Sequence, residues 1–293
     1  MSCEYFSEAI REAGTLIEEV RRVSAMQDHA LRVKAAVDLM TELQAAVIET
    51  SRMRKESIAW LRKNGHSMAD VAKLMGVSRA HVAQLRDAGP PPERAFLGTQ
   101  YVQVAVPTRP GEREYVAVED SSTGQRMLAV AQSLQLDGEL QYIPVSGEID
   151  LNRDDLVVVC GPKSSDAVAA VFGQDPRLAF ETLPDGRWAL VERESGKVYA
   201  SPSDDPQNAT PADVAYLGRL PRPDGQGTFL LIAGVHAVGS LGVAHYLSEN
   251  LASLYEEAGT SPFSMVVACD YTPEDKTVTE SRSASGVLLH EAA

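Results

Sequence analysis

The sequence is short of cysteine, has no long apolar run and carries no excess of positive charge, and each of these shortages excludes a class of protein. Three cysteines in 293 residues (Cys3, Cys160 and Cys269) are too few and too scattered for a disulfide framework or a cysteine-rich zinc site. No run of about 18 apolar residues exists, so a transmembrane helix is not expected. Residues 1–30 carry charges every few positions and lack the apolar segment of a secretory signal, which predicts a reduced, cytoplasmic protein.

The net charge of −14 disfavours binding to nucleic acid at first sight, but the charge is unevenly distributed. Residues 1–100 hold 14 Lys and Arg against 13 Asp and Glu, a net of +1, whereas residues 101–293 hold 13 against 28, a net of −15. Residues 49–86 hold 8 basic and 3 acidic side chains, a net of +5. Since a phosphate backbone responds to local charge, this segment is a candidate for contact with nucleic acid.

The composition, 44% hydrophobic and 23% charged, is that of a globular protein, and the length suggests two domains of about 100–200 residues each. Three consecutive prolines at 90–92 cannot continue a helix and mark the boundary. Helical patterns precede them, and strand-like apolar runs alternate with helices after them. We therefore predict an α+β multidomain protein. It has an all-α domain over 1–88, a proline-rich linker over 89–99, and an α/β domain with a mainly parallel sheet over 100–293.

Long helices are predicted before the basic segment. The first covers residues 4–23, and Asp28 is placed to cap a second helix that runs towards Met53. A further helical stretch, 58–63, ends at an Asn-Gly stop signal. Apolar residues recur along the second helix with a period of about 3.6, at Leu31, Ala35, Leu39, Leu43, Ala46 and Val47. This stripe indicates either a face packed in the core or the seam of a homodimer.

Residues 68–87, MADVAKLMGVSRAHVAQLRD, have the pattern of a helix-turn-helix. Ala72 is small where the two helices would cross, and Gly76, four residues on, permits the tight turn. Ser67 and Ser78 stand where the two helices would be capped. Apolar anchors fall at the core spacings Val71, Met75, Val77, Val82 and Leu85. The alternative interpretation is a helical hairpin that serves packing alone.

The stretch from about residue 51 to residue 86, which includes ESIAWLRKNGHSMADVAKLMGVSRAHVAQL, resembles the helix-turn-helix of sigma-70 region 4 and related regulators. The order of helices, motif and PPPERAFLG resembles helix-turn-helix regulators of actinobacteria, although nothing resembles a sigma region 2. A helix-turn-helix implies double-stranded DNA as the partner, with base contacts near the start of its second helix and phosphate contacts around it. The expected DNA contacts are Ser78, Arg79, His81, Gln84, Arg86, Lys73, Arg62 and Lys63, with Arg52, Arg54 and Lys55 as further candidates for phosphate.

After residue 100, apolar runs and turn signals predict a different architecture. We predict strands at 101–107, 115–118, 156–160, 188–191, 197–200, 228–233 and 264–268, helices at 125–134, 165–172 and 241–251, and a polar loop at 201–211. The run LVVVC at 156–160 is continuous, as in buried parallel strands.

Two loops link predicted buried strands to predicted helices, and ligands bind where such loops meet at the carboxyl ends of parallel strands. The expected ligand-binding residues are Gly161, Lys163, Ser164 and Ser165 in the first loop and Gly234, His236, Gly239 and Ser240 in the second. Small residues, a lysine and a helix N-terminus are typical of a site for a phosphate or another anion. The alternative is ordinary turn chemistry, and for His236 a structural or ligand-contacting role is favoured over a catalytic base.

The sequence lacks the motifs of several common catalytic and cofactor-binding sites. The sequence has no GxxxxGK[ST], GxGxxG, GxSxG, HExxH or EF-hand pattern, so it predicts no metal site and no particular cofactor. The acidic run at 148–155 is best interpreted as a solvated loop, and Cys160 as a small core residue.

These observations favour a transcription regulator that binds DNA as a homodimer, senses a small molecule through its second domain, and works in the cytoplasm at the nucleoid. A nucleotide- or nucleoside-processing enzyme with an accessory helix-turn-helix is the alternative. A third hypothesis is an interaction scaffold without a ligand.

Overall fold

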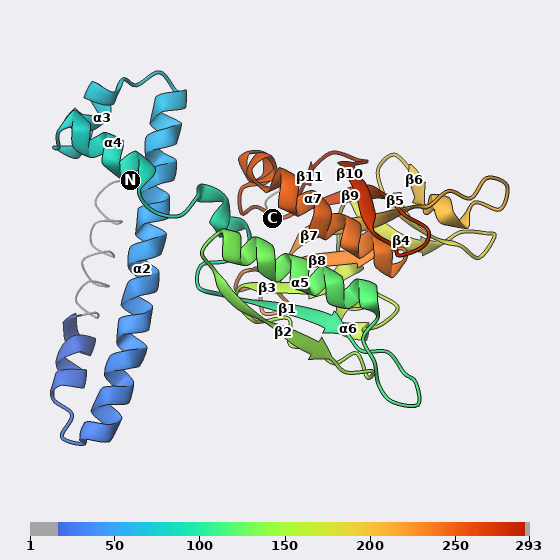
Figure 1. The fold of residues 1–293 in the computed structure, drawn as a ribbon, viewed down its shortest axis with the longest axis horizontal. Helices are drawn as coiled ribbons and strands as arrows, with labels where there is room; N and C mark the ends of the chain where they lie inside the picture. Colours follow the sequence, from blue (N-terminus) through green and yellow to red (C-terminus); the bar gives the residue numbers. More distant parts are fainter. Residues whose placement is uncertain (1–16, 291–293) are drawn as a thin grey trace. The chain divides into compact units, whose positions relative to one another are not determined.

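The computed structural model describes residues 17–290, and the chain divides between Gly89 and Pro90 into two compact units (Figure 1). Residues 17–24 are helical, in agreement with the end of the helix expected over 4–23; the rest of that helix, like Cys3, lies outside the described residues. Within residues 17–290, no helix combines the length and apolar character that crossing a membrane requires.

The first unit is built on one long helix, α2 (His29–Lys63), where the sequence suggested two stretches. Asp28 caps it as predicted, because its Oδ1 accepts the amides of Ala30 and Leu31 at 2.8 and 3.2 Å. The apolar stripe is not a core face along its length: Leu39 is buried, whereas Leu31 and Val47 are 61% and 65% exposed. A dimer seam on this helix stays a prediction.

Two short helices, α3 (Met68–Met75) and α4 (Arg79–Asp87), follow and form the expected helix-turn-helix. Ser67 and Asp70 make a complete capping box, in which each side chain accepts the other residue's amide, and Gly76 adopts a left-handed conformation at φ 67°. The core of this unit consists of Ile58, Val71, Ala72 and Val82, with Leu61, Met68, Met75, Val77 and Leu85 packed around it. All five predicted anchors are therefore in the core, completed by the last turns of α2.

The proline-rich segment expected as a linker is ordered and belongs to the second unit. Pro92–Phe96 forms a 3₁₀ helix, and Phe96 is fully buried. The Arg94 guanidinium, 2% exposed, donates to the carbonyl oxygens of Leu134 and Thr99, at 2.9 and 3.0 Å. The prolines exclude an α-helix, but the apolar and basic residues after them supply packing and hydrogen bonds to the sheet domain.

The second unit contains a mixed sheet with the strand order β10-β9-β7-β8-β3-β1-β2, and β11 pairs with β9. The pairs β1–β2, β1–β3 and β3–β8 are parallel, whereas β7, β9, β10 and β11 pair antiparallel. The expectation of a mainly parallel sheet thus holds for one half. The strands are β1 (Tyr101–Pro107), β2 (Asp137–Ile143), β3 (Leu156–Val159), β7 (Ala212–Pro221), β8 (Thr228–Gly234), β9 (Phe263–Tyr271), β10 (Val278–Ser283) and β11 (Leu288–Leu289).

Helices cover both faces of this sheet (Figure 1). One face packs against α5 (Val118–Ser133) and α7 (Ala237–Ala258). The other packs against α6 (Asp166–Phe172) and a small antiparallel sheet of β4 (Leu178–Thr182), β5 (Trp188–Glu192) and β6 (Val198–Ala200). The strand expected at 115–118 is replaced by a single bridge between Arg109 and Tyr115, because α5 begins at Val118.

Gly76→Ala tests the left-handed turn of the helix-turn-helix. An added Cβ meets no atom within 4 Å, so the cost is backbone strain alone, about 1 kcal/mol of unfolding free energy. Urea unfolding followed by circular dichroism measures it. Gly161→Ala is the matched control, because Gly161 has an ordinary φ and open space. Equal stability of the two variants would contradict the left-handed conformation at Gly76.

Candidate functional site

The helix-turn-helix directs one face of α4 into the core and leaves the expected DNA-contacting residues on the surface. Val82 is fully buried, whereas the side chains of Ser78, Arg79, His81, Gln84 and Arg86 are exposed. Ser78 caps α4 by accepting the His81 amide at 3.1 Å, and its hydroxyl keeps a proton to donate. The exposed start of a second helix is the part that reaches base edges in known helix-turn-helix complexes.

The basic side chains of this unit differ in whether they already have a hydrogen-bond or ion-pair partner within the protein. Arg79 has no hydrogen-bond or ion-pair partner within residues 17–290, whereas Arg86 pairs with Asp87 at 2.8 Å. Arg62 donates to the His66 carbonyl at 2.6 Å and remains exposed, as do Lys63 and Lys73. Arg79 and Lys73 are therefore the exposed cations of this group for which residues 17–290 provide neither a hydrogen bond nor an ion pair.

Arg52 is not a phosphate contact, contrary to the sequence interpretation. Its side chain is buried and forms ion pairs with Glu49 at 2.7 Å and Glu56 at 2.8 Å. The i,i+3 and i,i+4 spacing on α2 brings these three residues together.

In the second unit, the two predicted loops line one cleft of about 420 Å³ at the carboxyl ends of β1, β3 and β8. Of the expected residues, Gly161, Lys163, Ser164, Gly234, His236 and Ser240 line it. The loops converge because β3 and β8 are adjacent and parallel, so both chains leave the sheet at the same edge.

Ser165 and Gly239 do not line this cleft, and the structure gives each of them a different role. The Ser165 hydroxyl donates to the Gly147 carbonyl at 2.6 Å and accepts the Val168 amide at 3.3 Å, which caps α6. A Cβ at Gly239 would lie 2.5 Å from Asp213 Oδ2, so glycine there allows α7 to approach β7 closely. In each loop, therefore, one predicted residue serves the local backbone structure and the others line the cleft.

His236 sits between two carboxylates that the sequence interpretation missed. Its Nδ1 lies 3.3 Å from Asp213 Oδ1 and its Nε2 lies 3.3 Å from Asp204 Oδ1, while its amide donates to Asp213 Oδ2 at 3.0 Å. The hydrogen bond with Asp213, followed by the charges of Asp213 and Asp204, raises the pKa of His236, against the opposing effects of burial and of Lys163. Nδ1 thus donates to Asp213, whereas Nε2 lies within ion-pair distance of Asp204 and makes no hydrogen bond with it.

Lys163 faces two aromatic rings of the small sheet. Its Nζ lies 4.2 Å from the ring centroid of Trp188 and 5.9 Å from that of Phe180. Burial lowers the pKa of Lys163, against the charges of Asp204 and Asp213. Phe180 lines the cleft beside Lys163, whereas Trp188 lines an adjoining hollow that includes Lys163 and His236. A cation next to a flat apolar ring suits a planar anionic molecule.

The lining of the cleft includes a further ion pair, between Arg109 and Asp120, that no sequence pattern predicted. Arg109 donates to Asp120 at 2.8 Å, and Asp120 is buried. Burial raises the pKa of Asp120, and the hydrogen bond from Arg109 opposes this shift. Arg109 and Asp120 were missed because they lie on a loop and on α5 and meet only in the fold. Asp213 carried a usable signal, a charged residue inside the apolar run ADVAY.

The two cysteines of the second unit are shielded from solvent. Cys160 and Cys269 are buried, and burial raises the pKa of each thiol to about 12. Within residues 17–290, no cluster of three or more His, Cys, Asp or Glu side chains is arranged to hold a metal ion.

Comparisons with protein-family models, with curated proteins and with solved structures found no match to this chain. Its function is accordingly argued from the two sites themselves.

The His236 environment predicts a pH dependence. We expect the imidazole to titrate above its ordinary 6.5, and we expect Asp204→Asn to lower the midpoint. Because folding raises the pKa of this histidine, protonation adds to the free energy of unfolding. The contribution is complete at a pH below the pKa of the unfolded chain and is lost as the pH rises through the pKa of the folded chain. A proton NMR titration, with His236→Gln to assign the resonance, measures the midpoint. A value at or below 6.5 would show that the carboxylates do not hold the proton.

Proposed function

We propose that this protein is a sequence-specific DNA-binding transcription regulator whose second unit senses a small anionic molecule. The observation that carries the proposal is the helix-turn-helix itself. Its caps, left-handed turn and buried anchors agree with the pattern, and α4 presents Arg79, His81 and Gln84 to solvent. Arginine and glutamine are suited to bidentate contacts with guanine and adenine in the major groove.

The charge distribution supports DNA binding through the first unit alone. Residues 49–86 carry a net of +5, whereas residues 101–293 carry a net of −15 and would repel a duplex. Phosphate contacts by exposed basic residues such as Lys73 would make the affinity fall steeply as salt is raised.

The cleft of the second unit supports a sensor better than an enzyme. His236 is held by Asp213 through its amide and Nδ1, and its Nε2 lies 3.3 Å from Asp204. These carboxylates raise the pKa of His236 and so favour a cationic ring, which suits a fixed contact to an anionic ligand better than proton abstraction. Lys163, the amides of the loop that follows β3 and the start of α7 offer charge and donors to an anion. Nucleotides, whose bases would stack on Phe180 in the cleft lining, are the first class to test.

A homodimer would give the regulator its mechanism. One helix-turn-helix covers a short site, and dimers read two half-sites at a fixed spacing. The exposed apolar residues Leu31, Val37 and Val47 on α2 support a seam between two copies. A ligand that prefers one arrangement of the protomers would shift the population towards or away from the spacing that fits the operator.

Arg79→Ala tests base recognition. We expect selection from a random duplex library to yield a shared motif for the full chain. On that motif, Arg79→Ala should weaken binding by about 1–3 kcal/mol if the guanidinium contacts a base. Fluorescence anisotropy at several salt concentrations measures both the affinity and its salt dependence.

The matched control for this experiment is Arg126→Ala, which removes an exposed arginine of α5 in the acidic unit. Its affinity for DNA should equal that of the unchanged chain. Failure to select any shared motif would leave the helix-turn-helix as a packing or protein-contact element.

Lys163→Met tests the sensor. A nucleotide present at 100 times its dissociation constant should raise the unfolding free energy of the second unit by about 2.7 kcal/mol. Thermal unfolding with a panel of nucleoside mono-, di- and triphosphates and with inorganic phosphate measures the effect, which Lys163→Met should reduce. Lys197→Met, which removes a lysine stacked on Tyr199, should retain it. If none of these compounds stabilises the protein, the anion-sensing role is wrong.

A further inference from the structure

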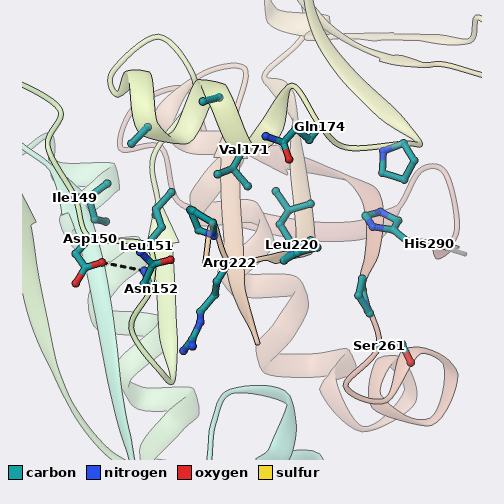
Figure 2. Close-up of a pocket in the computed structure, with 16 residues that line it drawn as sticks. Ile149, Asp150, Leu151, Asn152, Val171, Gln174, Leu220, Arg222, Ser261 and His290 are labelled. Atoms are coloured by element: carbon teal, nitrogen blue, oxygen red, sulfur yellow. Dashed lines mark hydrogen bonds between the residues drawn. The ribbon is translucent and has the colours of Figure 1, made fainter. Parts of the chain in front are cut away.

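A second and larger cavity, of about 720 Å³, lies in the second unit at the opposite edge of the sheet from the cleft (Figure 2). It is lined by residues that precede β3, β8 and β9, at 149–152, 221–223 and 261–262, whereas the cleft lies where β3 and β8 end. The side of α6 that carries Ala167, Ala170 and Val171 forms its roof. Nothing in the sequence interpretation or in the proposed function uses this cavity.

Ten of the sixteen residues that line the cavity are apolar; the polar ones are Asp150, Asn152, Gln174, Arg222, Ser261 and His290. Figure 2 shows Val171 and Leu220 between the two ends of the cavity, with Asp150 and Asn152 towards one end and His290 towards the other. A volume of this size matches cavities of about 300–1,000 Å³ that enclose a small organic molecule. The apolar lining selects against a hydrated ion and favours a molecule with a hydrocarbon or aromatic body.

His290 joins the cavity to a buried hydrogen-bond network. Its side chain is 7% exposed, and its Nε2 lies 2.7 Å from Ser264 Oγ. Ser264 and Tyr216, both fully buried, each donate a proton to Asp175 Oδ2. Asp175 Oδ1 accepts the amides of Arg177 and Leu178 at 2.7 and 2.9 Å.

Proton counting in this network fixes the tautomer of His290. Because the Ser264 hydroxyl proton is committed to Asp175, Ser264 Oγ must accept, and His290 Nε2 must donate to it. Burial lowers the pKa of His290, which favours the neutral ring. In a neutral ring with a proton on Nε2, Nδ1 carries a lone pair. Nδ1 has no hydrogen-bond partner within residues 17–290.

We propose that this cavity binds an uncharged, mainly apolar small molecule whose hydroxyl or N–H group donates a hydrogen bond to His290 Nδ1. The apolar part of the lining holds the body of the ligand, and the donor satisfies the acceptor for which residues 17–290 supply no partner. A ligand of the same shape without a donor would desolvate Nδ1 without compensation, so the site discriminates between the two.

The network does not form a serine nucleophile. In a catalytic triad the carboxylate orients the histidine, and the histidine accepts the serine proton. Here Ser264 donates to Asp175 directly, is fully buried, and accepts from His290. The arrangement holds the imidazole in one orientation and one tautomer, which is the role of a binding site.

Two matched probes test the proposal: 2-naphthol, which carries a hydroxyl donor, and 2-methoxynaphthalene, which has the same aromatic body without one. Titration calorimetry with the full chain should show binding of both, with 2-naphthol tighter by about threefold to tenfold, the effect of one hydrogen bond. In His290→Phe the ring volume remains but the acceptor is lost, so the two affinities should become equal.

Because His290→Phe disturbs a buried network, a second variant tests the location independently. Ala170→Trp, on an exposed position of α6, should fill the cavity and weaken both probes at least about tenfold. Ser253→Trp places the same side chain on the exposed face of α7 and should leave both affinities unchanged. Equal affinity of the two probes for the unchanged chain, or undiminished binding in Ala170→Trp, would overturn the proposal. Binding of neither probe to the unchanged chain would also do so.

Discussion

The parallel pairing of β3 with β8 is the constraint on which the second unit depends. Val157, Val158 and Val159 pair with Leu230, Leu231 and Ile232, and all six are buried. Burial on both faces requires covering layers, which α5, α6, α7 and the small sheet supply. The parallel direction also determines where openings form. The chains leave both strands at one edge, where the cleft lies, and enter them at the other, where the apolar cavity lies.

The loop that carries His236 is positioned by the carboxylate of Asp213, which is not accessible to water. Asp213 is fully buried on β7, and an isolated charge there would be costly. The amide and imidazole of His236 are placed against it at 3.0 and 3.3 Å, and Gly239 allows the first turn of α7 to come near. The carboxylate thus fixes the loop that carries His236, and it does so from a strand separated from that loop by the whole of β8.

Sequence reasoning succeeded where the governing interactions are local. The caps at Asp28, Ser67 and Ser78 each act within three residues, and the left-handed turn is encoded by Gly76 alone. The five anchors follow from the helical period and were predictable, whereas the contribution of Ile58 and Leu61 from the end of α2 was not. The continuous runs of β3 and β8 identified buried strands, and the small residues after them identified the two loops of the cleft.

It failed where a residue's role is set by a distant partner. The strand β7 was missed because Asp213 and Arg219 interrupt its apolar pattern. Each of these charged residues has a partner that is distant in the sequence: Asp213 pairs with His236, and Arg219 donates to the Phe96 carbonyl. Without β7 the sheet was expected to be mainly parallel. The same holds for His290. Its Nδ1 lone pair follows from the proton that Ser264 donates to Asp175, 89 residues away in the sequence, a carboxylate that also accepts from Tyr216, 41 residues away. No local sequence pattern shows which of these groups donates a proton and which accepts one, so His290 Nδ1 can be identified as an acceptor only from the folded structure.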